Sequence, residues 1–159
     1  MLSNKYVLAE EVTSLEVAKK LYNKTIPIIV DNPKSILLFR EVDKEYLWEF
    51  TKTVVSGKEP SYFLVSYVNE EGEYVGVSLF SKGNPWYNLK KTVISEELTV
   101  SFKRGFGITR AVSKYLESCL GDTADIIMAS SANTYCAKLI ENTYSKFGYT
   151  SFKNYYKSV

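Results

Sequence analysis

The sequence predicts an α+β fold within one domain, residues 1–159. Strand-like and helical stretches follow one another in the order β-α-α-β-β-β-α-β-α-β, and no repeat or low-complexity tract interrupts them. A domain near 150 residues buries about 70% of the surface that its unfolded chain exposes, so this chain can form a sizeable core by itself. Hydrophobic residues at 45% and charged residues at 24% are typical of a globular protein rather than a disordered one.

The N-terminal quarter of the chain predicts one strand and one helix, followed by a segment with mixed signals. Lys5–Val12 alternates weakly as a strand, and Ser14 fits the N-cap of a helix that runs through Tyr22. Residues 23–42 contain Pro27 and two apolar clusters, and the pattern leaves short strands and a loop over the core both open. This segment is therefore left unassigned.

A helix and a hairpin follow. Asp43–Val55 has helical spacing, with four apolar side chains on one face: Tyr46, Leu47, Phe50 and Val54. Ser61–Asn69 and Glu73–Phe80 flank the turn Glu70-Glu71-Gly72 and predict two antiparallel strands.

The C-terminal half predicts a further strand, helix, strand, helix and strand. In order, we expect a long turn over Ser81–Lys91, a strand-like run at Leu98–Phe102, a helix over Ala111–Leu120, a short strand at Asp125–Ala129, a helix over Ala132–Lys146 and a last strand at Tyr149–Lys157. The pair Ser130-Ser131 fits the N-cap of the last helix.

The turn before the helix at Ala111 has the composition of an anion site. It reads Arg104-Gly105-Phe106-Gly107-Ile108-Thr109-Arg110-Ala111. Glycines let the backbone turn tightly and approach a ligand, and the N–H groups that open the next helix then point at one spot with the helix dipole behind them. Neither the G-x-G-x-x-G dinucleotide signature nor the Walker loop occurs in the chain.

This turn resembles the pyrophosphate loop of the GCN5-related N-acetyltransferase (GNAT) superfamily, Arg/Gln-x-x-Gly-x-Gly/Ala. Arg104, Gly107 and Thr109 occupy the three motif positions, with threonine where the family has glycine or alanine. A second segment is similar to the family's closing signature Tyr-x-Lys-x-Gly-Phe. It is matched here by Tyr144, Lys146, Gly148 and Tyr149, while the family's helix-opening asparagine falls on Ala137.

The resemblance implies a GNAT-like fold, with a central, mixed but mostly antiparallel twisted sheet flanked by helices. It also implies an acetyl-CoA-dependent N-acyltransferase, in which a primary amine attacks the thioester directly through a tetrahedral intermediate. The alternative is a GNAT-fold protein with weak or lost turnover that binds CoA or a protein partner. Acetyl-CoA is the expected cosubstrate, and an amine of a small molecule or a protein is the expected acceptor.

The same resemblance assigns candidate site residues. Tyr144 matches the tyrosine that protonates the leaving thiolate, although its helical stripe also fits a core aromatic. Glu96 or Glu97, at the start of the fourth strand, could accept the amine proton. Since neighbouring residues in a strand face opposite ways, at most one of the two lines the cleft. Alternatively, both glutamates are exposed charges at the entrance of the strand, or a chain of water molecules accepts the proton. The residues expected to hold the cofactor are Leu98, Thr99, Val100, Arg104, Gly105, Phe106, Gly107, Ile108, Thr109 and Arg110, the first three through backbone groups at an oxyanion.

The loop after the hairpin has two readings. In the GNAT fold this loop borders the acceptor, so Trp86 and Tyr87 could form an acceptor wall. Aromatic residues in a loop that contains proline also commonly staple that loop to the body of the protein.

Composition narrows the remaining chemistry. The chain has no histidine, which excludes catalysis through an imidazole and the common zinc sites, and no metal site is expected. Cys119 and Cys136 lie in predicted helices and are expected to be packed thiols. No apolar run reaches the ~18 residues needed to cross a bilayer, and none near the N-terminus fits a signal peptide, so we expect no membrane contact and a cytoplasmic location.

Charge distribution adds one feature. The net charge is only +2, but seven basic and two acidic residues fall between Lys82 and Lys114. This cluster is either a solvated face or a screen for an anionic cofactor. Nucleic acid is not expected, because the aromatic residues have core-like spacing rather than forming an exposed stacking row. A monomer and a homodimer paired through the last strand both remain open.

Overall fold

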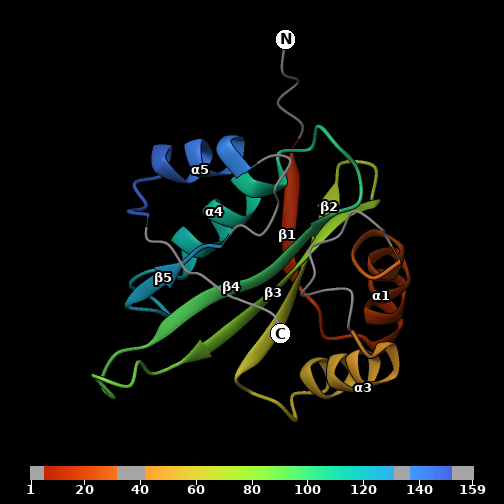
Figure 1. The fold of residues 1–159 in the computed structure, drawn as a ribbon, viewed down its shortest axis with the longest axis horizontal. Coiled ribbons are helices and arrows are strands. Elements are labelled where there is room, and N and C mark those ends of the chain that lie inside the picture. The colour runs from red at the N-terminus through yellow and green to blue at the C-terminus, as the bar shows by residue number, and fades with distance from the viewer. Residues whose placement is uncertain (1–5, 32–41, 131–136, 152–159) are drawn as a thin grey trace, which may run out of the picture.

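The computed structural model describes residues 6–31, 42–130 and 137–151. Five strands form one sheet in the order β1-β2-β3-β4-β5, antiparallel except for the parallel pair β4 and β5 (Figure 1). The strands are β1 (Val7–Glu11), β2 (Tyr62–Asn69), β3 (Tyr74–Gly83), β4 (Val93–Ser101) and β5 (Ile126–Met128). The helices are α1 (Leu15–Ile29), α3 (Lys44–Val55), α4 (Ile108–Cys119) and α5 (Ala137–Lys146). This α+β architecture confirms the predicted fold class.

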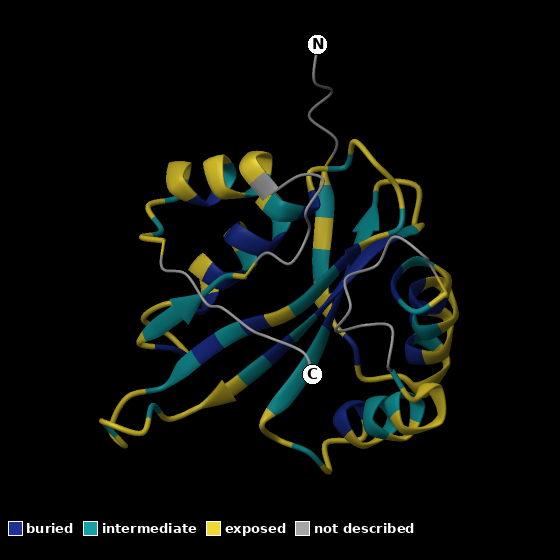
Figure 2. Cartoon of the chain, viewed as in Figure 1, coloured by how far each residue is buried: buried dark blue, intermediate teal, exposed yellow. Residues whose placement is uncertain are grey.

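Helices cover both faces of the sheet, with α1 and α3 on one side and α4 and α5 on the other (Figure 1). Each face has its own apolar core, and the most buried residues follow the middle of the sheet (Figure 2). Val65, Tyr67 and Phe80 pack with α4, whereas Val77 and Val100 pack with α1. The central strands therefore lie between two apolar layers, and a polar group placed there must find a partner inside the protein.

Helix α1 is longer than predicted, because it continues past Tyr22 and includes Pro27. A proline in a helix removes one backbone hydrogen bond and costs about 3 kcal/mol. Ile26 and Ile29 are both buried, and a fully buried isoleucine contributes roughly 1.5–3 kcal/mol. Burial of the two side chains thus offsets the proline, so the short strands or loop considered for the first apolar cluster, residues 28–30, are wrong. The second cluster, residues 36–39, lies outside the described residues.

The second predicted helix and the hairpin are confirmed. Asp43 caps α3 by accepting a hydrogen bond from the N–H of Tyr46 at 3.0 Å. The assignment of Tyr46 to the apolar face is wrong, since its side chain is 69% exposed. In the hairpin turn, the Asn69 side-chain oxygen accepts from the N–H groups of Glu71 and Glu73, at 3.0 and 2.9 Å, which fixes the loop between β2 and β3.

The C-terminal elements occur in the predicted order with shifted ends. Strand β4 begins at Val93, so Glu96 and Glu97 lie inside the strand and not at its start. Helix α4 begins at Ile108, three residues earlier than predicted. Residues 149–151 are not in a strand, and the rest of the predicted last strand lies outside the described residues, as do Ser131, Cys136 and the start of the last predicted helix. Cys119 is a buried free thiol, as expected.

Candidate active site

An irregularity in β4 determines which side chains reach the site. Leu98 pairs with Leu79 and Glu96 pairs with Phe80, so Glu97 is an extra residue that forms a β-bulge. Glu96 and Thr99 consequently lie on the α4 side of the sheet, while Glu97 and Leu98 line a cavity on the α1 side. The prediction that the two glutamates face opposite ways is confirmed, and the reading in which both are exposed is wrong because Glu96 is only 6% exposed.

The buried carboxylate of Glu96 accepts three hydrogen bonds. The donors are the Thr99 hydroxyl at 2.5 Å, the Ser130 N–H at 2.8 Å and the Tyr144 hydroxyl at 2.6 Å. Burial raises the pKa of Glu96 above its ordinary value, and the three donors reduce that shift without reversing it. The site therefore contains a carboxyl group that takes up a proton more readily than a surface glutamate.

Tyr144 reaches this carboxylate from α5. Its side chain is 8% exposed, and its ring packs against the ring of Tyr149 with the centroids 5.3 Å apart. Burial, and then the negative charge of Glu96, raise the pKa of the Tyr144 phenol, so the hydroxyl keeps its proton at neutral pH. Tyr144 is thus both a core aromatic and the holder of a proton beside Glu96.

Tyr149, just after α5, is half-buried. Its hydroxyl is buried and has no hydrogen-bond partner among the described residues. Burial raises the pKa of this phenol to about 12.

A chain of hydroxyl groups extends from Glu96 into the middle of the sheet. The Thr99 hydroxyl lies 2.6 Å from the Ser78 hydroxyl, which lies 2.8 Å from the Tyr67 hydroxyl. Ser78 and Tyr67 are completely buried. The sequence analysis did not identify Ser78, Tyr67 or the side-chain role of Thr99. A signal was present, since Ser78 interrupts the apolar run of β3 and a buried serine in a central strand needs a polar partner.

Strands β4 and β5 separate next to Glu96. Within the described residues their backbone pairing ends at Ser95 and Met128, whereas β4 continues to Ser101. Beyond that point Ser130 binds Glu96 twice, through its N–H to the carboxylate and through its hydroxyl to the carbonyl at 2.9 Å. The two hydrogen bonds between Ser130 and Glu96 therefore take the place of backbone strand pairing where β4 and β5 diverge. Leu98, Thr99 and Val100 follow this point on β4.

The glycine turn lies at the end of the same strand and has the predicted geometry. Gly105 and Gly107 have φ values of +84° and +66°, and Gly107 caps α4 without a side-chain hydrogen bond. Arg104 and Arg110 are exposed and form no ion pair with other described residues. The N-terminus of α4 thus presents backbone N–H groups beside two available guanidinium groups, which suits an anion. Thr109 lies half-buried in the first turn of α4.

Two residues of the surrounding basic cluster are engaged elsewhere. Lys103 pairs with Glu73 at 2.8 Å, and Lys91 pairs with Asp125 at 3.4 Å. These two lysines are held by acidic partners, whereas the two arginines of the glycine turn form no ion pair with other described residues.

The predicted acceptor residues lie apart from this constellation. Trp86 and Tyr87 are 91% and 65% exposed in the loop between β3 and β4, and they contact each other edge to face. Their exposure is contrary to the reading in which they staple the loop to the body.

Other functional groups were sought in the described part of the chain. No cluster of three or more potential metal ligands occurs there. None of the described helices combines the length and the hydropathy required to span a bilayer.

Comparison with known proteins identifies the fold. No family model matches the chain, and no curated protein sequence matches it significantly. Among solved structures, a transcriptional regulator from Bacillus halodurans superposes with a TM-score of 0.68 at 15% identity, covering 97% of this chain and 99% of that one. A predicted acetyltransferase from Clostridium acetobutylicum, solved with acetyl-CoA, gives 0.65 at 11% identity over 97% and 96% of the two chains. An aminoglycoside antibiotic 6′-N-acetyltransferase from Acinetobacter baumannii gives 0.63 at 8% identity over 97% and 99%.

These similarities, together with the strand order and the glycine turn, show that the chain has the fold of the GCN5-related N-acetyltransferases. The resemblance predicted from two short motifs is confirmed at the level of the fold.

Proposed function

We propose that this protein transfers an acetyl group from acetyl-CoA to a primary amine. The observation that carries the proposal is the position of Tyr144, whose hydroxyl reaches Glu96 at 2.6 Å where β4 and β5 separate. A glycine turn fit to bind an anion lies at the end of the same strand. A ligand with its phosphates at that turn and its chain along β4 would place its reactive end near these two side chains.

The residues of the turn fit a pyrophosphate. Two glycines with positive φ bring the backbone close, and an added Cβ at either position meets no atom within 4 Å, so the space in front of the turn is open. Arg104 and Arg110 supply charge-assisted hydrogen bonds, and the N-terminus of α4 supplies N–H groups. The threonine at position 109 lies within the helix, and the fit does not depend on its side chain.

Acetyl transfer requires two proton movements, and each has a candidate group. The attacking ammonium must lose a proton before its nitrogen bonds to the thioester carbon, since an aliphatic amine has a pKa of about 10.4. When the C–S bond breaks, the thiolate takes a proton, which Tyr144 holds. Solvent then returns a proton to the Tyr144 oxygen, and the Glu96 carboxylate, which accepts the Tyr144 hydrogen bond, orients that hydroxyl. The backbone of Leu98–Val100 is our candidate for stabilising the oxyanion.

The β-bulge divides the two glutamates between these roles. Glu96 contacts Tyr144 and serves the leaving-group side. Glu97 is exposed on the opposite face of the sheet, where its carboxylate accepts a hydrogen bond from Ser81 at 2.5 Å. We therefore assign the acceptance of the amine proton to Glu97, directly or through water.

One observation favours a second candidate function, the binding of CoA without turnover. The Tyr144 hydroxyl is directed at Glu96 and is largely buried, so it must turn toward a thiolate to act as an acid. A protein in which this hydrogen bond persists would bind CoA and transfer no acetyl group.

Thermal unfolding with and without acetyl-CoA tests the binding step. A ligand at 100 times its Kd adds about 2.7 kcal/mol to the free energy of unfolding, which raises Tm by a few degrees in a domain of this size. We expect this rise in the wild-type protein and a smaller one in Arg104→Ala. Lys114→Ala is the matched control, because it removes an exposed positive charge from α4, beyond the glycine turn.

Thiol release from acetyl-CoA in the presence of amines tests the transfer step. Loss of release in Tyr144→Phe with an unchanged acetyl-CoA shift supports Tyr144 as the acid. Binding without release for any amine would favour the second candidate function, and the absence of a thermal shift would refute both.

A further inference from the structure

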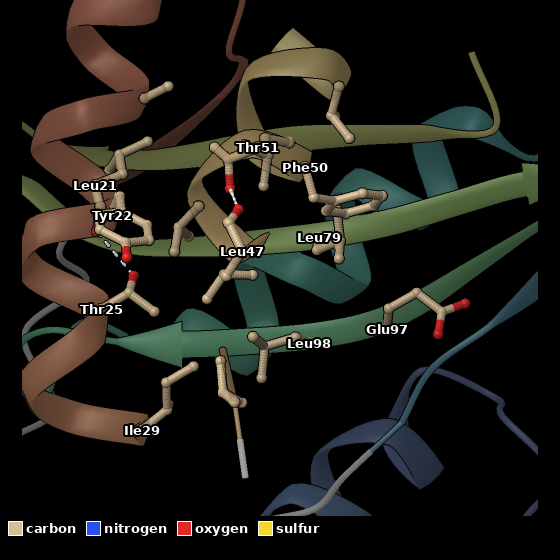
Figure 3. A pocket seen from close by; sticks show the side chains of 15 residues that line it. Leu21, Tyr22, Thr25, Ile29, Leu47, Phe50, Thr51, Leu79, Glu97 and Leu98 are labelled. Atoms are coloured by element: carbon tan, nitrogen blue, oxygen red, sulfur yellow. Dashed lines mark hydrogen bonds between the residues drawn. The ribbon is translucent and has the colours of Figure 1, made fainter. Parts of the chain in front are cut away.

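A cavity lined by described residues lies on the α1 side of the sheet, on the face opposite to Tyr144. It has a volume of about 270 Å³ and lies between α1, α3 and the strands β2, β3 and β4. Its apolar wall includes Leu21, Ile29, Leu47, Phe50, Leu79 and Leu98, which gather between the two helices and the sheet in Figure 3. An apolar cavity of about 150 Å³ holds a benzene ring, so this space accommodates an aromatic ring or a medium alkyl chain.

The polar side chains in the wall do not make it hydrophilic. Tyr22, Thr25 and Thr51 each donate their hydroxyl proton to a backbone carbonyl, at 2.7, 2.8 and 2.7 Å respectively. They therefore present mainly a ring and two methyl groups to the cavity. A ligand with several hydroxyl groups would lose its hydrogen bonds to water here, at a cost of about 1–3 kcal/mol for each unpaired group.

A single carboxylate stands at the edge of this space. Of the described residues that line the cavity, Glu97 alone is charged, and Figure 3 shows it at one end of the apolar group with its oxygens directed outward. The β-bulge puts Glu97 there, because regular alternation would have placed Glu97 and Leu98 on opposite faces. A ligand that matches both features has an apolar body and one positive charge.

We infer that the cavity binds the body of the acyl acceptor and that this acceptor is a primary amine with one aryl or alkyl group, its ammonium beside Glu97. The inference rests on the proposed function, and it names the substrate class of the same site. Glu97 directly follows Glu96 in the chain, so an amine held by Glu97 lies next to the point where β4 and β5 separate. Polyamines carry more positive charges than the single carboxylate of Glu97 can pair, and polyhydroxylated amines do not fit the apolar wall.

Binding of amines to the full chain, measured by calorimetry in the presence of CoA, tests the inference. The probes are 2-phenylethylamine, its neutral counterpart 2-phenylethanol, ethylamine and spermidine. We expect 2-phenylethylamine to bind more than tenfold more tightly than ethylamine, since each buried methylene contributes about 0.8 kcal/mol, or about fourfold. 2-Phenylethylamine should bind about fivefold more tightly than 2-phenylethanol, because a partly exposed ion pair with Glu97 contributes about that much to affinity.

Two variants test separately how the charge of Glu97 and the volume of the cavity contribute to binding. Glu97→Gln should abolish the preference for 2-phenylethylamine over 2-phenylethanol, with Glu70→Gln in the exposed hairpin turn as the control. Leu47→Phe partly fills the cavity and should weaken both aromatic probes while leaving ethylamine unchanged. Leu139→Phe, at a 67% exposed position on α5, controls for the added ring.

Acetyl transfer to the same probes distinguishes the failure of this inference from the failure of the proposed function. Tight binding of 2-phenylethylamine without acetylation supports the cavity and Glu97 as the binding site of such an amine and argues against the proposed function. Acetylation of spermidine in preference to 2-phenylethylamine supports the proposed function and overturns the inference. Equal binding of amine and alcohol to the wild-type protein also overturns it.

Discussion

Replacing Tyr144 with phenylalanine removes one hydroxyl group from a buried site and leaves the aromatic packing in place. The hydroxyl donates one of three hydrogen bonds to the Glu96 carboxylate, which is 6% exposed and has no compensating cation among its described hydrogen-bond partners. A hydrogen bond to a charged group contributes about 1.5–3 kcal/mol, against about 0.5–1.5 kcal/mol between neutral groups. We expect Tyr144→Phe to lower the free energy of unfolding by the larger amount at about pH 8.

The loss depends on pH with a definite sign. Burial raises the pKa of Glu96 in the folded protein, so its contribution to stability is fully present below the ordinary carboxyl pKa and is lost as pH rises through the raised value. Without the tyrosine donor that pKa is raised further. The difference between Tyr144→Phe and wild type should therefore grow as pH rises, and below the ordinary carboxyl pKa it should approach the value for a neutral hydrogen bond.

Urea denaturation followed by tryptophan fluorescence measures this difference, with Trp48 as a half-buried reporter on α3. Tyr46→Phe is the control, because it removes a hydroxyl from an exposed tyrosine and should change the free energy of unfolding by less than ~0.5 kcal/mol. In the background of Glu96→Gln, Tyr144→Phe should have a small effect without pH dependence. If Tyr144→Phe matches Tyr46→Phe at both pH values, the assignment of a charged hydrogen bond at this site is refuted.

Two further predictions concern the sheet. Gly76→Ala should lower the free energy of unfolding by about 1–3 kcal/mol, because the new Cβ would lie 2.9 Å from a backbone oxygen of β4. Gly83→Ala is the control and should be nearly neutral, because its new Cβ meets no atom within 4 Å. Equal urea midpoints for the two variants would contradict the prediction. Ser78→Ala should cost about 1–3 kcal/mol by leaving the buried hydroxyl of Tyr67 without a partner, and Ser78→Ala combined with Tyr67→Phe should recover part of that loss. A double variant no more stable than the single one would show that the Ser78–Tyr67 hydrogen bond is not the source of the cost.

The features that local sequence could predict are those whose physics is local. The turn around Gly107 was predictable because a strand, two glycines and a helix start follow each other within a few residues, and the positive φ values confirm that geometry. Tyr144 was singled out by the resemblance of its segment to the closing signature of the GNAT superfamily, which also matches Gly148. The hairpin between β2 and β3 was predictable from alternation and from its polar turn.

The features that were missed depend on residues far apart in the chain. The end of α1 was wrong because the burial of Ile26 and Ile29 against the sheet outweighs the local effect of Pro27. The position of Tyr46 on α3 was wrong because helical spacing gives a face, while the neighbouring elements decide how much of that face is covered.

The amino-acid sequence by itself predicted the class of fold and the glycine turn, since both follow from short-range backbone and spacing rules. Tyr144 became the candidate acid through the resemblance to the closing signature of the GNAT superfamily. Only the tertiary structure decided where the side chains of the two adjacent glutamates lie. A one-residue bulge against β3 directs Glu96 toward Tyr144 and Ser130, and Glu97 toward the apolar cavity between α1 and α3. The physical reason is that burial, and with it the pKa of Glu96 and the surroundings of Glu97, is a property of the neighbours that the fold brings together.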